Sequence, residues 1–299
     1  MPTSISSVTD RPASHPAAPG VGDEEAAGSG SERIAEAFAA AHEQGRAALM
    51  PYLMGGFPDA ETSLAVAGSY ADAGADLIEL GVPFSDPLAD GPVIHAAATR
   101  ALAGGATLEG VLSICERLAG RLPVVPMVYA NMVLARGPSE FARSLADAGA
   151  AGVIVPDLPL EEAGEIGEEL SGAGVALVPL VAPTTPDERR RRICERAEGF
   201  VYVVSDTGVT GERDGLPDGL AELVAAVRAD ATVPAAVGFG IGTPEQAAAV
   251  GRIADGVIIG SRLVRAVSEA DGAGPAVEAV SEFIRAAREA ISDRGRSVE

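Results

Sequence analysis

Three acidic side chains lie in one segment that begins inside a short apolar run, DLIEL at 76–80. Glu79 lies inside that run, and Asp86 and Asp90 follow in a proline-rich segment, ELGVPFSDPLADGP. A carboxylate inside a buried strand loses its hydration, which raises its pKa and suits it to transfer protons near neutral pH. We therefore predict Glu79 as a catalytic acid or base and Asp90 as a second carboxylate at the same cavity. The alternatives are an ion pair with arginine for Glu79, a turn or helix cap for Asp90, and a turn or surface contact for Asp86.

Three glycine-rich segments each follow an apolar run: SDTGVTGE (205–212), GFGIGTPEQ (238–246) and GSR (260–262). Glycine lets the backbone approach a bound anion, and the N–H groups at a helix N-terminus favour phosphate. The alternative is that these segments are only tight turns. The predicted phosphate-binding residues are Gly211, Gly240, Gly260 and Ser261.

Aromatic residues stand near the ends of several runs. Tyr202 lies in FVYVV, with Tyr52, Tyr129 and Phe239 near other runs. Together they could line a pocket for an aromatic ligand, although core packing explains each one alone. The four successive arginines at 189–192 are typical of a solvated helix face.

These residues need a scaffold, and the apolar runs indicate one. Runs rich in Val, Ile and Leu alternate with Ala-rich amphipathic segments, which favours strands covered on both faces of a parallel sheet. Eight such units after one leading helix, with Ser31 as its N-cap and Gly45 as its stop, predict a (β/α)8 TIM barrel rather than a doubly wound sheet. Helix starts are expected at Asp59 or Glu61, and at Pro138, Pro186 and Pro244, with the last helix ending at Gly251. The runs are ALMPYLM (48–54), DLIEL (76–80), PVVPMVY (123–129), GVIVP (152–156), VALVPL (175–180), FVYVV (200–204), PAAVGF (234–239) and GVIIG (256–260).

The domain organisation follows from composition along the chain. Residues 1–31 are rich in Pro, Ser, Gly and Ala, which is typical of a disordered tail. Residues 32–296 are predicted to form a single barrel domain. The N-terminal segment has no basic region followed by an apolar core, and no apolar stretch reaches membrane-spanning length, so we expect a cytoplasmic protein.

Composition excludes several function classes. The chain has 299 residues and a net charge of −21, and all 22 basic residues are arginine. Without lysine, Schiff-base chemistry, lysine-bound pyridoxal phosphate (PLP) and Walker A loops are excluded in this chain. The negative charge argues against nucleic acid and anionic membranes as partners. Cys115 and Cys194 have no metal-ligand spacing and are expected to be buried free thiols.

The motifs together resemble the tryptophan synthase alpha subunit family. ELGVPFSDPLADGP, YANMV (129–133), SDTGVTG (205–211), GFGIGTPEQ (238–246) and GVIIGS (256–261) carry the resemblance, which covers about residues 33 to 290. The resemblance implies a TIM-barrel lyase (EC 4.2.1.20) that cleaves indole-3-glycerol phosphate to indole and glyceraldehyde 3-phosphate in L-tryptophan biosynthesis. It implies no organic cofactor or metal in this chain.

The resemblance also implies roles and a partner. Glu79 would be the catalytic acid/base, Asp90 would face the indole N–H, and Tyr202 would lie beside the substrate. The four predicted phosphate-binding residues fall where the family binds phosphate. The partner would be the PLP-dependent beta subunit in an alpha2beta2 heterotetramer, met by Asp86 and the 83–90 loop. Met54, Gly55, Asp206 and Thr207 depart from the pattern that the family usually shows.

The main alternative is another phosphate-binding TIM-barrel enzyme of aromatic amino-acid biosynthesis. Indole-glycerol-phosphate synthase depends on a lysine acid, which this chain lacks, and a phosphoribosyl isomerase would need a different acid/base pair with two matching phosphate loops. A regulatory barrel without activity would be expected to have lost Glu79 or Asp90, and both are present.

Overall fold

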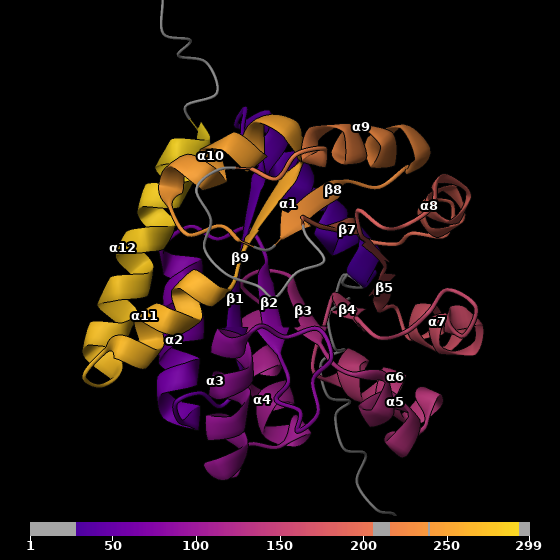
Figure 1. Cartoon of the computed structure of the whole chain (residues 1–299). Helices are drawn as coiled ribbons and strands as arrows, with labels where there is room; N and C mark the ends of the chain where they lie inside the picture. The colour runs from indigo at the N-terminus through magenta and orange to yellow at the C-terminus, as the bar shows by residue number, and fades with distance from the viewer. Residues whose placement is uncertain (1–27, 206–215, 239, 293–299) are drawn as a thin grey trace, which may run out of the picture.

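The strands form one parallel sheet that curls into a barrel with helices around it (Figure 1). The computed structural model describes residues 28–205, 216–238 and 240–292. Most of the predicted tail therefore lies outside the described residues, and the domain boundaries stay a prediction. The strands are β1 (Ala48–Met54), β2 (Ile78–Gly81), β3 (Val124–Met127), β4 (Gly152–Ile154), β5 (Ala176–Val178), β6 (Leu180–Val181), β7 (Val201–Val204), β8 (Ala235–Gly238) and β9 (Gly256–Ile259).

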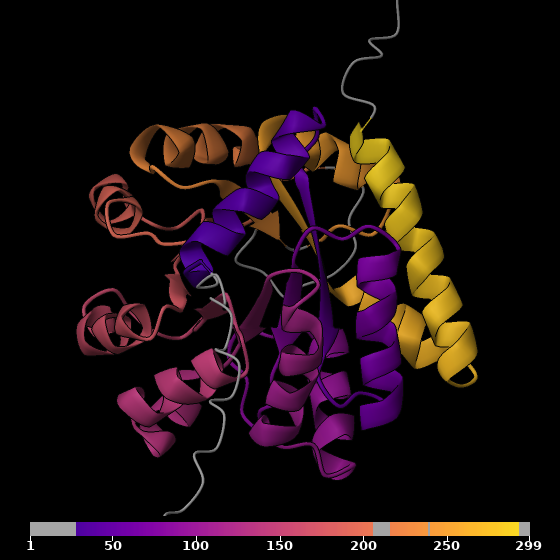
Figure 2. The ribbon, with the colours of Figure 1, turned by 180° about the vertical axis from the view of Figure 1, so that it is seen from behind.

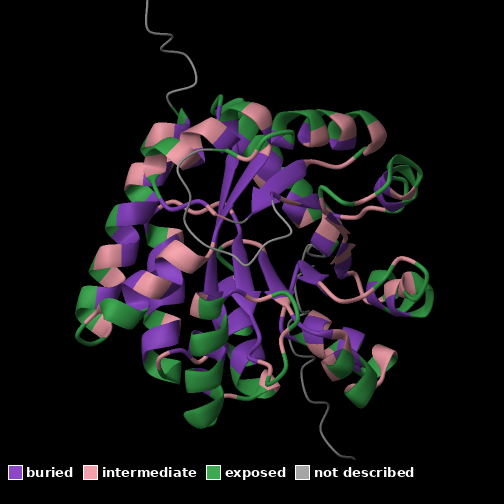
Figure 3. Cartoon of the chain, viewed as in Figure 1, coloured by how far each residue is buried: buried purple, intermediate pink, exposed green. Residues whose placement is uncertain are grey.

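Helices surround the sheet on its outer face, with their exposed sides outward and buried strands at the centre (Figure 3). The C-terminal helix α12 packs along α2 and α10. The helices are α1 (Gly30–Glu43), α2 (Ala60–Asp72), α3 (Pro92–Ala103), α4 (Leu108–Ala119), α5 (Ala130–Arg136), α6 (Pro138–Asp147), α7 (Ala163–Gly172), α8 (Asp187–Cys194), α9 (Leu220–Asp230), α10 (Pro244–Ile253), α11 (Ser261–Glu269) and α12 (Ala273–Ser292).

The barrel prediction is confirmed, with one strand divided in two. The strand order is β5-β4-β3-β2-β1-β9-β8-β7-β6, and the predicted run at 175–180 contributes β5 and the first of the two residues of β6. Pro179, which has no N–H to donate to a sheet, lies between them. β5 pairs with β4 while β6 pairs with β7, so this one run joins the two ends of the sheet.

The leading helix α1 closes one end of the barrel (Figure 2). Its Ile34 and Phe38 are buried in the same apolar cluster as interior residues of the strands, such as Met50 and Ile258. The Phe38 ring lies 5.8 Å from the Phe200 ring, centroid to centroid. Ligand access is therefore left to the opposite end, where the strands finish.

The start of α1 corrects the predicted N-cap. Ser29 caps the helix, and Ser31 lies inside it. The Glu32 N–H donates to Ser29 Oγ at 3.3 Å while the Ser29 N–H donates to Glu32 Oε2 at 2.7 Å. This reciprocal capping box requires Glu or Gln three residues after the cap. Of the two serines only Ser29 has one, Glu32, whereas Ser31 is followed by Ile34.

Two further local expectations are wrong. Helix α10 runs through Gly251 to Ile253, and Gly251 lies where α12 comes close, because a Cβ there would stand 3.2 Å from Ile291. The arginines at 189–192 do not form a uniformly solvated face. Arg190 is buried, and its Nε donates to Asp230 Oδ2 at 2.9 Å.

Other expectations hold. Asp59 caps α2, and the Thr62 N–H donates to its carboxylate at 2.8 Å. Cys115 and Cys194 are buried free thiols. Within the described ranges, no helix combines the length and the apolar character needed to cross a bilayer.

Candidate active site

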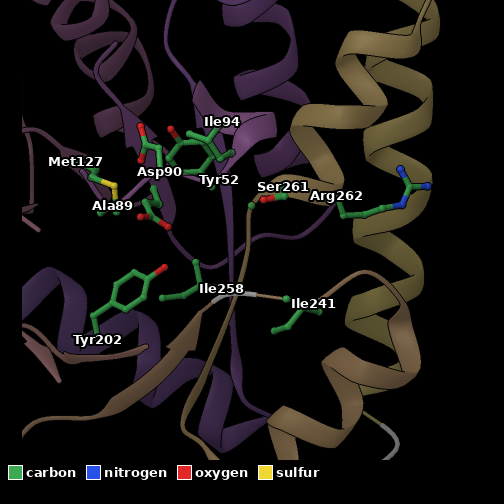
Figure 4. Close-up of a pocket in the computed structure, with 14 residues that line it drawn as sticks. Tyr52, Ala89, Asp90, Ile94, Met127, Tyr202, Ile241, Ile258, Ser261 and Arg262 are labelled. Atoms are coloured by element: carbon green, nitrogen blue, oxygen red, sulfur yellow. The ribbon is translucent and has the colours of Figure 1, made fainter. Parts of the chain in front are cut away.

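A cavity opens at the end of the barrel where the strands finish, between the loops after β2, β8 and β9 (Figure 4). Fourteen residues line it, and six of them are predicted site residues: Glu79, Asp90, Tyr202, Gly240, Gly260 and Ser261. Gly211, like Phe239, lies outside the described residues. The other lining residues are Tyr52, Ala89, Gly91, Ile94, Met127, Ile241, Ile258 and Arg262.

Glu79 lies in β2 with its side chain inside the barrel and is 1% exposed. Its Oε1 is buried and has no hydrogen-bond partner within the described part of the chain. Burial, with a further contribution from the charge of Asp90, raises the pKa of Glu79 to about 8. No arginine forms an ion pair with Glu79 in the described ranges, so the structural alternative is not supported there. A group with this pKa can both donate and accept a proton near neutral pH.

Asp90 approaches the cavity from the loop between β2 and α3. Burial raises its pKa, and a hydrogen bond with Tyr129 and the nearby His95 act in the opposite direction. Asp90 is not the N-cap of α3, because Gly91 occupies that position. Asp86, in contrast, is exposed and accepts a hydrogen bond from Ser85, as expected for a turn residue.

Two buried tyrosines cross the interior of the barrel, each above a glycine of the neighbouring strand. A Cβ at Gly81 would lie 2.0 Å from Tyr52 Oη, and one at Gly238 would lie 2.2 Å from Tyr202 Oη. Glycine is therefore required at both positions for the rings to lie as they do. Burial raises the pKa of both phenols well above the usual value, with smaller contributions from neighbouring carboxylates. The two hydroxyls therefore stay protonated and neutral.

The opposite wall of the cavity is formed by Gly240 and by the start of α11. Gly260 is the N-cap of α11 and provides no side chain to cap the helix, whereas α10 is capped by its own Thr243 and Gln246. The Arg262 guanidinium lies over the Phe283 ring, 5.1 Å from its centroid, and points away from the cavity (Figure 4). An anion at this wall would be held by backbone N–H groups rather than by that arginine.

Sequence reasoning missed the apolar part of the lining. Met127 ends β3 and Ile258 lies in β9, and both point into the barrel beside the predicted residues. Their positions next to strand ends were a usable signal, because alternate residues of a barrel strand face inward. Ile94 lies in the first turn of α3 and Ile241 lies in the loop between β8 and α10, so no strand pattern pointed to either residue.

Comparisons with known proteins agree on one family. The profile of the family described as tryptophan synthase alpha chain matches residues 38–292. The tryptophan synthase alpha chain of Prochlorococcus marinus is 50% identical over 240 residues, which cover 79% of this chain and 87% of that one. That of Roseiflexus castenholzii is 47% identical over 259 residues, covering 86% and 99%.

The solved structures lead to the same family. A chain of the Mycobacterium tuberculosis tryptophan synthase superposes with a TM-score of 0.80 at 36% identity, covering 87% of this chain and 98% of that chain. This chain belongs to the tryptophan synthase alpha chain family. It is a lyase of tryptophan biosynthesis that carries out the alpha reaction (EC 4.2.1.20). The alternative of a different phosphate-binding barrel enzyme finds no support in these matches.

Proposed function

We propose that Glu79 and Asp90 are the two carboxylates with which this chain cleaves indole-3-glycerol phosphate to indole and glyceraldehyde 3-phosphate. The observation that supports this is the buried, unpartnered Oε1 of Glu79, next to Asp90 in a cavity at the end of the barrel. A buried polar atom without a partner costs about 1–3 kcal/mol. Such a cost is expected where a substrate supplies the missing partner.

Glu79 moves two protons in opposite directions. With its pKa raised to about 8, the free side chain carries a proton at neutral pH. It donates that proton to C3 of the indole ring, and the resulting carboxylate then takes the proton of the C3′ hydroxyl. The C3–C3′ bond breaks, its electron pair restores the aromatic ring, and the C3′ oxygen becomes the aldehyde oxygen. Glu79 ends protonated, so the proton balance closes within one turnover.

Asp90 acts on charge rather than on protons. Protonation at C3 places positive charge on the indole ring, centred on N1, and an ionised carboxylate beside N1 stabilises that charge. Asp90 therefore has to be ionised while Glu79 is protonated. Activity is expected to fall at low pH as Asp90 protonates, and to fall above about pH 8 as Glu79 loses its proton.

The remaining predicted residues hold the substrate. Tyr202, with Met127 and Ile258, forms the apolar wall for the indole ring. Gly240, Gly260 and Ser261 form the wall for the phosphate, with Gly211 as a further predicted contact outside the described residues. Binding the phosphate at the open start of α11 fixes the glycerol chain in position and contributes orientation rather than proton transfer.

We also propose that the chain works with a tryptophan synthase beta subunit in an alpha2beta2 heterotetramer. Leu88 on the loop after β2 is 85% exposed, and Leu134 on α5 is 63% exposed. Large apolar side chains this exposed suit a surface that another subunit covers. PLP would then belong to the beta subunit, which is consistent with a chain that has no lysine. A cytoplasmic location stays a prediction.

The test is indole release from indole-3-glycerol phosphate, with and without a beta subunit. Glu79→Gln and Asp90→Asn keep the size of each side chain. Glu79→Gln is expected to lower kcat by roughly 10²–10⁴-fold, the usual contribution of a general acid or base, and Asp90→Asn by roughly 10²–10³-fold, the usual contribution of a group that stabilises charge in the transition state. Glu116→Gln, at an exposed position on α4, is the matched control and should leave the rate unchanged. Cleavage at the parent rate by either site variant would refute the assignment. Where activity is lost, binding of glyceraldehyde 3-phosphate shows that the variant still folds.

A further inference from the structure

Tyr129 lies just outside the cavity at the turn from β3 to α5, and the surrounding backbone holds it firmly. It is 3% exposed. On one side the Val128 N–H donates to the Ile154 carbonyl at 2.9 Å, and on the other the Ala130 N–H donates to Asp157 Oδ1 at 2.8 Å. The residue is thus fixed between the ends of β3 and β4, independently of the loop that carries Asp90.

The loop at 83–90, in contrast, has few attachments of its own. The Val82 N–H donates to the Met127 carbonyl at 2.9 Å, and the next backbone N–H that donates to a backbone carbonyl is that of His95. Among the described residues, no backbone N–H or carbonyl of 83–90 pairs with another backbone group. The position of Asp90 therefore depends on side-chain contacts.

Tyr129 supplies these contacts at both ends of the loop. Its ring stacks on Phe84 with centroids 5.1 Å apart and planes at 24°. Its hydroxyl oxygen accepts the Ala89 N–H at 3.2 Å, and the hydroxyl lies near enough to the Asp90 carboxylate to lower its pKa. One rigid side chain thus contacts the first turn of the loop and the carboxylate at its end.

We propose that Tyr129 is the positioning residue for Asp90, holding the 83–90 loop in the conformation in which this carboxylate faces the cavity. The ring sets the path of the loop through Phe84, and the hydroxyl sets its end through Ala89 and Asp90. Tyr129 does not line the cavity itself, so it acts through Asp90 and not on the substrate. The inference rests on the proposed role of Asp90.

The hydroxyl also affects the ionisation of Asp90. Its hydrogen bond opposes the rise in the pKa of Asp90 that burial causes, as does His95. Tyr52 and Glu79 are the other titratable groups near Asp90 at the cavity, and Asp157 lies near Tyr129. All of them stay in place when only the hydroxyl is removed, so a change in the titration of Asp90 can be assigned to that hydroxyl.

The experiment compares Tyr129→Phe with Tyr129→Leu in the full-length chain with its beta subunit. Tyr129→Phe keeps the stack on Phe84 and removes the hydroxyl. A hydrogen bond to a charged group corresponds to roughly one pKa unit or more. We therefore expect the acidic limb of the kcat profile to move up by about one pH unit, kcat at the acidic edge to fall roughly tenfold, and KM to change little. Tyr129→Leu removes the stack as well and should raise KM in addition.

Tyr70→Phe is the matched control, because Tyr70 is the one tyrosine of the four that is neither Tyr129 nor a cavity residue. Its hydroxyl donates to the Tyr52 carbonyl at 3.1 Å, so the variant should lose thermal stability with the acidic limb unchanged. A Tyr129→Phe profile that coincides with the parent profile would overturn the inference, as would an equal shift in Tyr70→Phe. If Asp90→Asn keeps the parent rate, the proposed role of Asp90 has failed first, and the two failures are distinguished.

Discussion

Two carboxylates only three residues apart, Asp76 and Glu79, lie in opposite environments within the same barrel. Asp76 precedes β2 at the closed end and is paired with Arg46 at 2.5 Å and 2.7 Å. It also accepts the Leu49 N–H at 2.8 Å. Glu79, within β2, has an oxygen with no partner among the described residues and a pKa raised to about 8.

The difference separates a carboxylate that holds the fold from one that is available for chemistry. A buried charge that is paired and hydrogen-bonded fixes the elements around it, here the start of β1 and the segment before β2. The buried Glu79 carboxyl has an oxygen without a partner among the described residues, and its raised pKa lets it hold a proton at neutral pH and still exchange it with a substrate. Burial alone does not distinguish the two, since both side chains are largely covered.

The largest effect expected from this comparison is on stability at Asp76. Asp76→Asn keeps an acceptor for the Leu49 N–H but leaves the Arg46 guanidinium, 2% exposed, without its counter-charge. Removing one partner of a buried pair costs about 3–5 kcal/mol, so the free energy of unfolding should fall by about 3 kcal/mol or more. Urea denaturation measures this loss. The kcat of the folded fraction should stay at the parent value. A loss of kcat without a loss of stability would contradict this prediction, because Asp76 and not Glu79 would then act in catalysis.

Much of this arrangement could be predicted from the sequence because it depends on local pattern. Continuous Val and Ile runs predicted the strands, but not the division at Pro179, since Pro51 and Pro126 lie inside undivided strands. Glu79 was identifiable because an acid inside an apolar run has to be buried. The cap of α1 could also have been found, since Ser29 has Glu32 three residues later and Ser31 has no acid at that spacing.

Other features depend on contacts between distant segments and leave no local signal. Arg190 is buried because Asp230, forty residues later, pairs with it. The role inferred for Tyr129 requires Phe84, Ala89 and Asp90 to meet it across two loops. Gly251 marks a close approach by α12 and not a helix end, which only the packed helices show.

A second effect on stability, one that depends on pH, is expected at Glu79. The pKa of Glu79 is raised from about 4.5 to about 8, so the folded state holds this proton more tightly than the unfolded chain does. Its contribution is fully present below about pH 4.5 and is lost progressively as the pH rises to about 8. Glu79→Gln cannot ionise, so its stability relative to the parent should rise by about 1.4 kcal/mol per pH unit over that window. Thermal unfolding at pH 5, 6.5 and 8 measures this, and parallel curves for the two proteins would contradict it.

The smallest effect is expected when both charges at the closed end are removed together. Arg46→Met with Asp76→Asn leaves no buried charge without a partner and keeps the acceptor for the Leu49 N–H. Replacing a whole buried pair is often close to neutral, so the double variant should recover most of the stability that Asp76→Asn alone loses. Arg46 also donates to the Ala47 carbonyl and to Gln44, and those lost bonds limit the recovery. The contradicting outcome is a double variant whose loss of stability equals the sum of the losses in the two single variants. Asp76 would then stabilise the barrel through its backbone contact rather than through its charge. The contrast with Glu79 would in that case depend on hydrogen bonding alone.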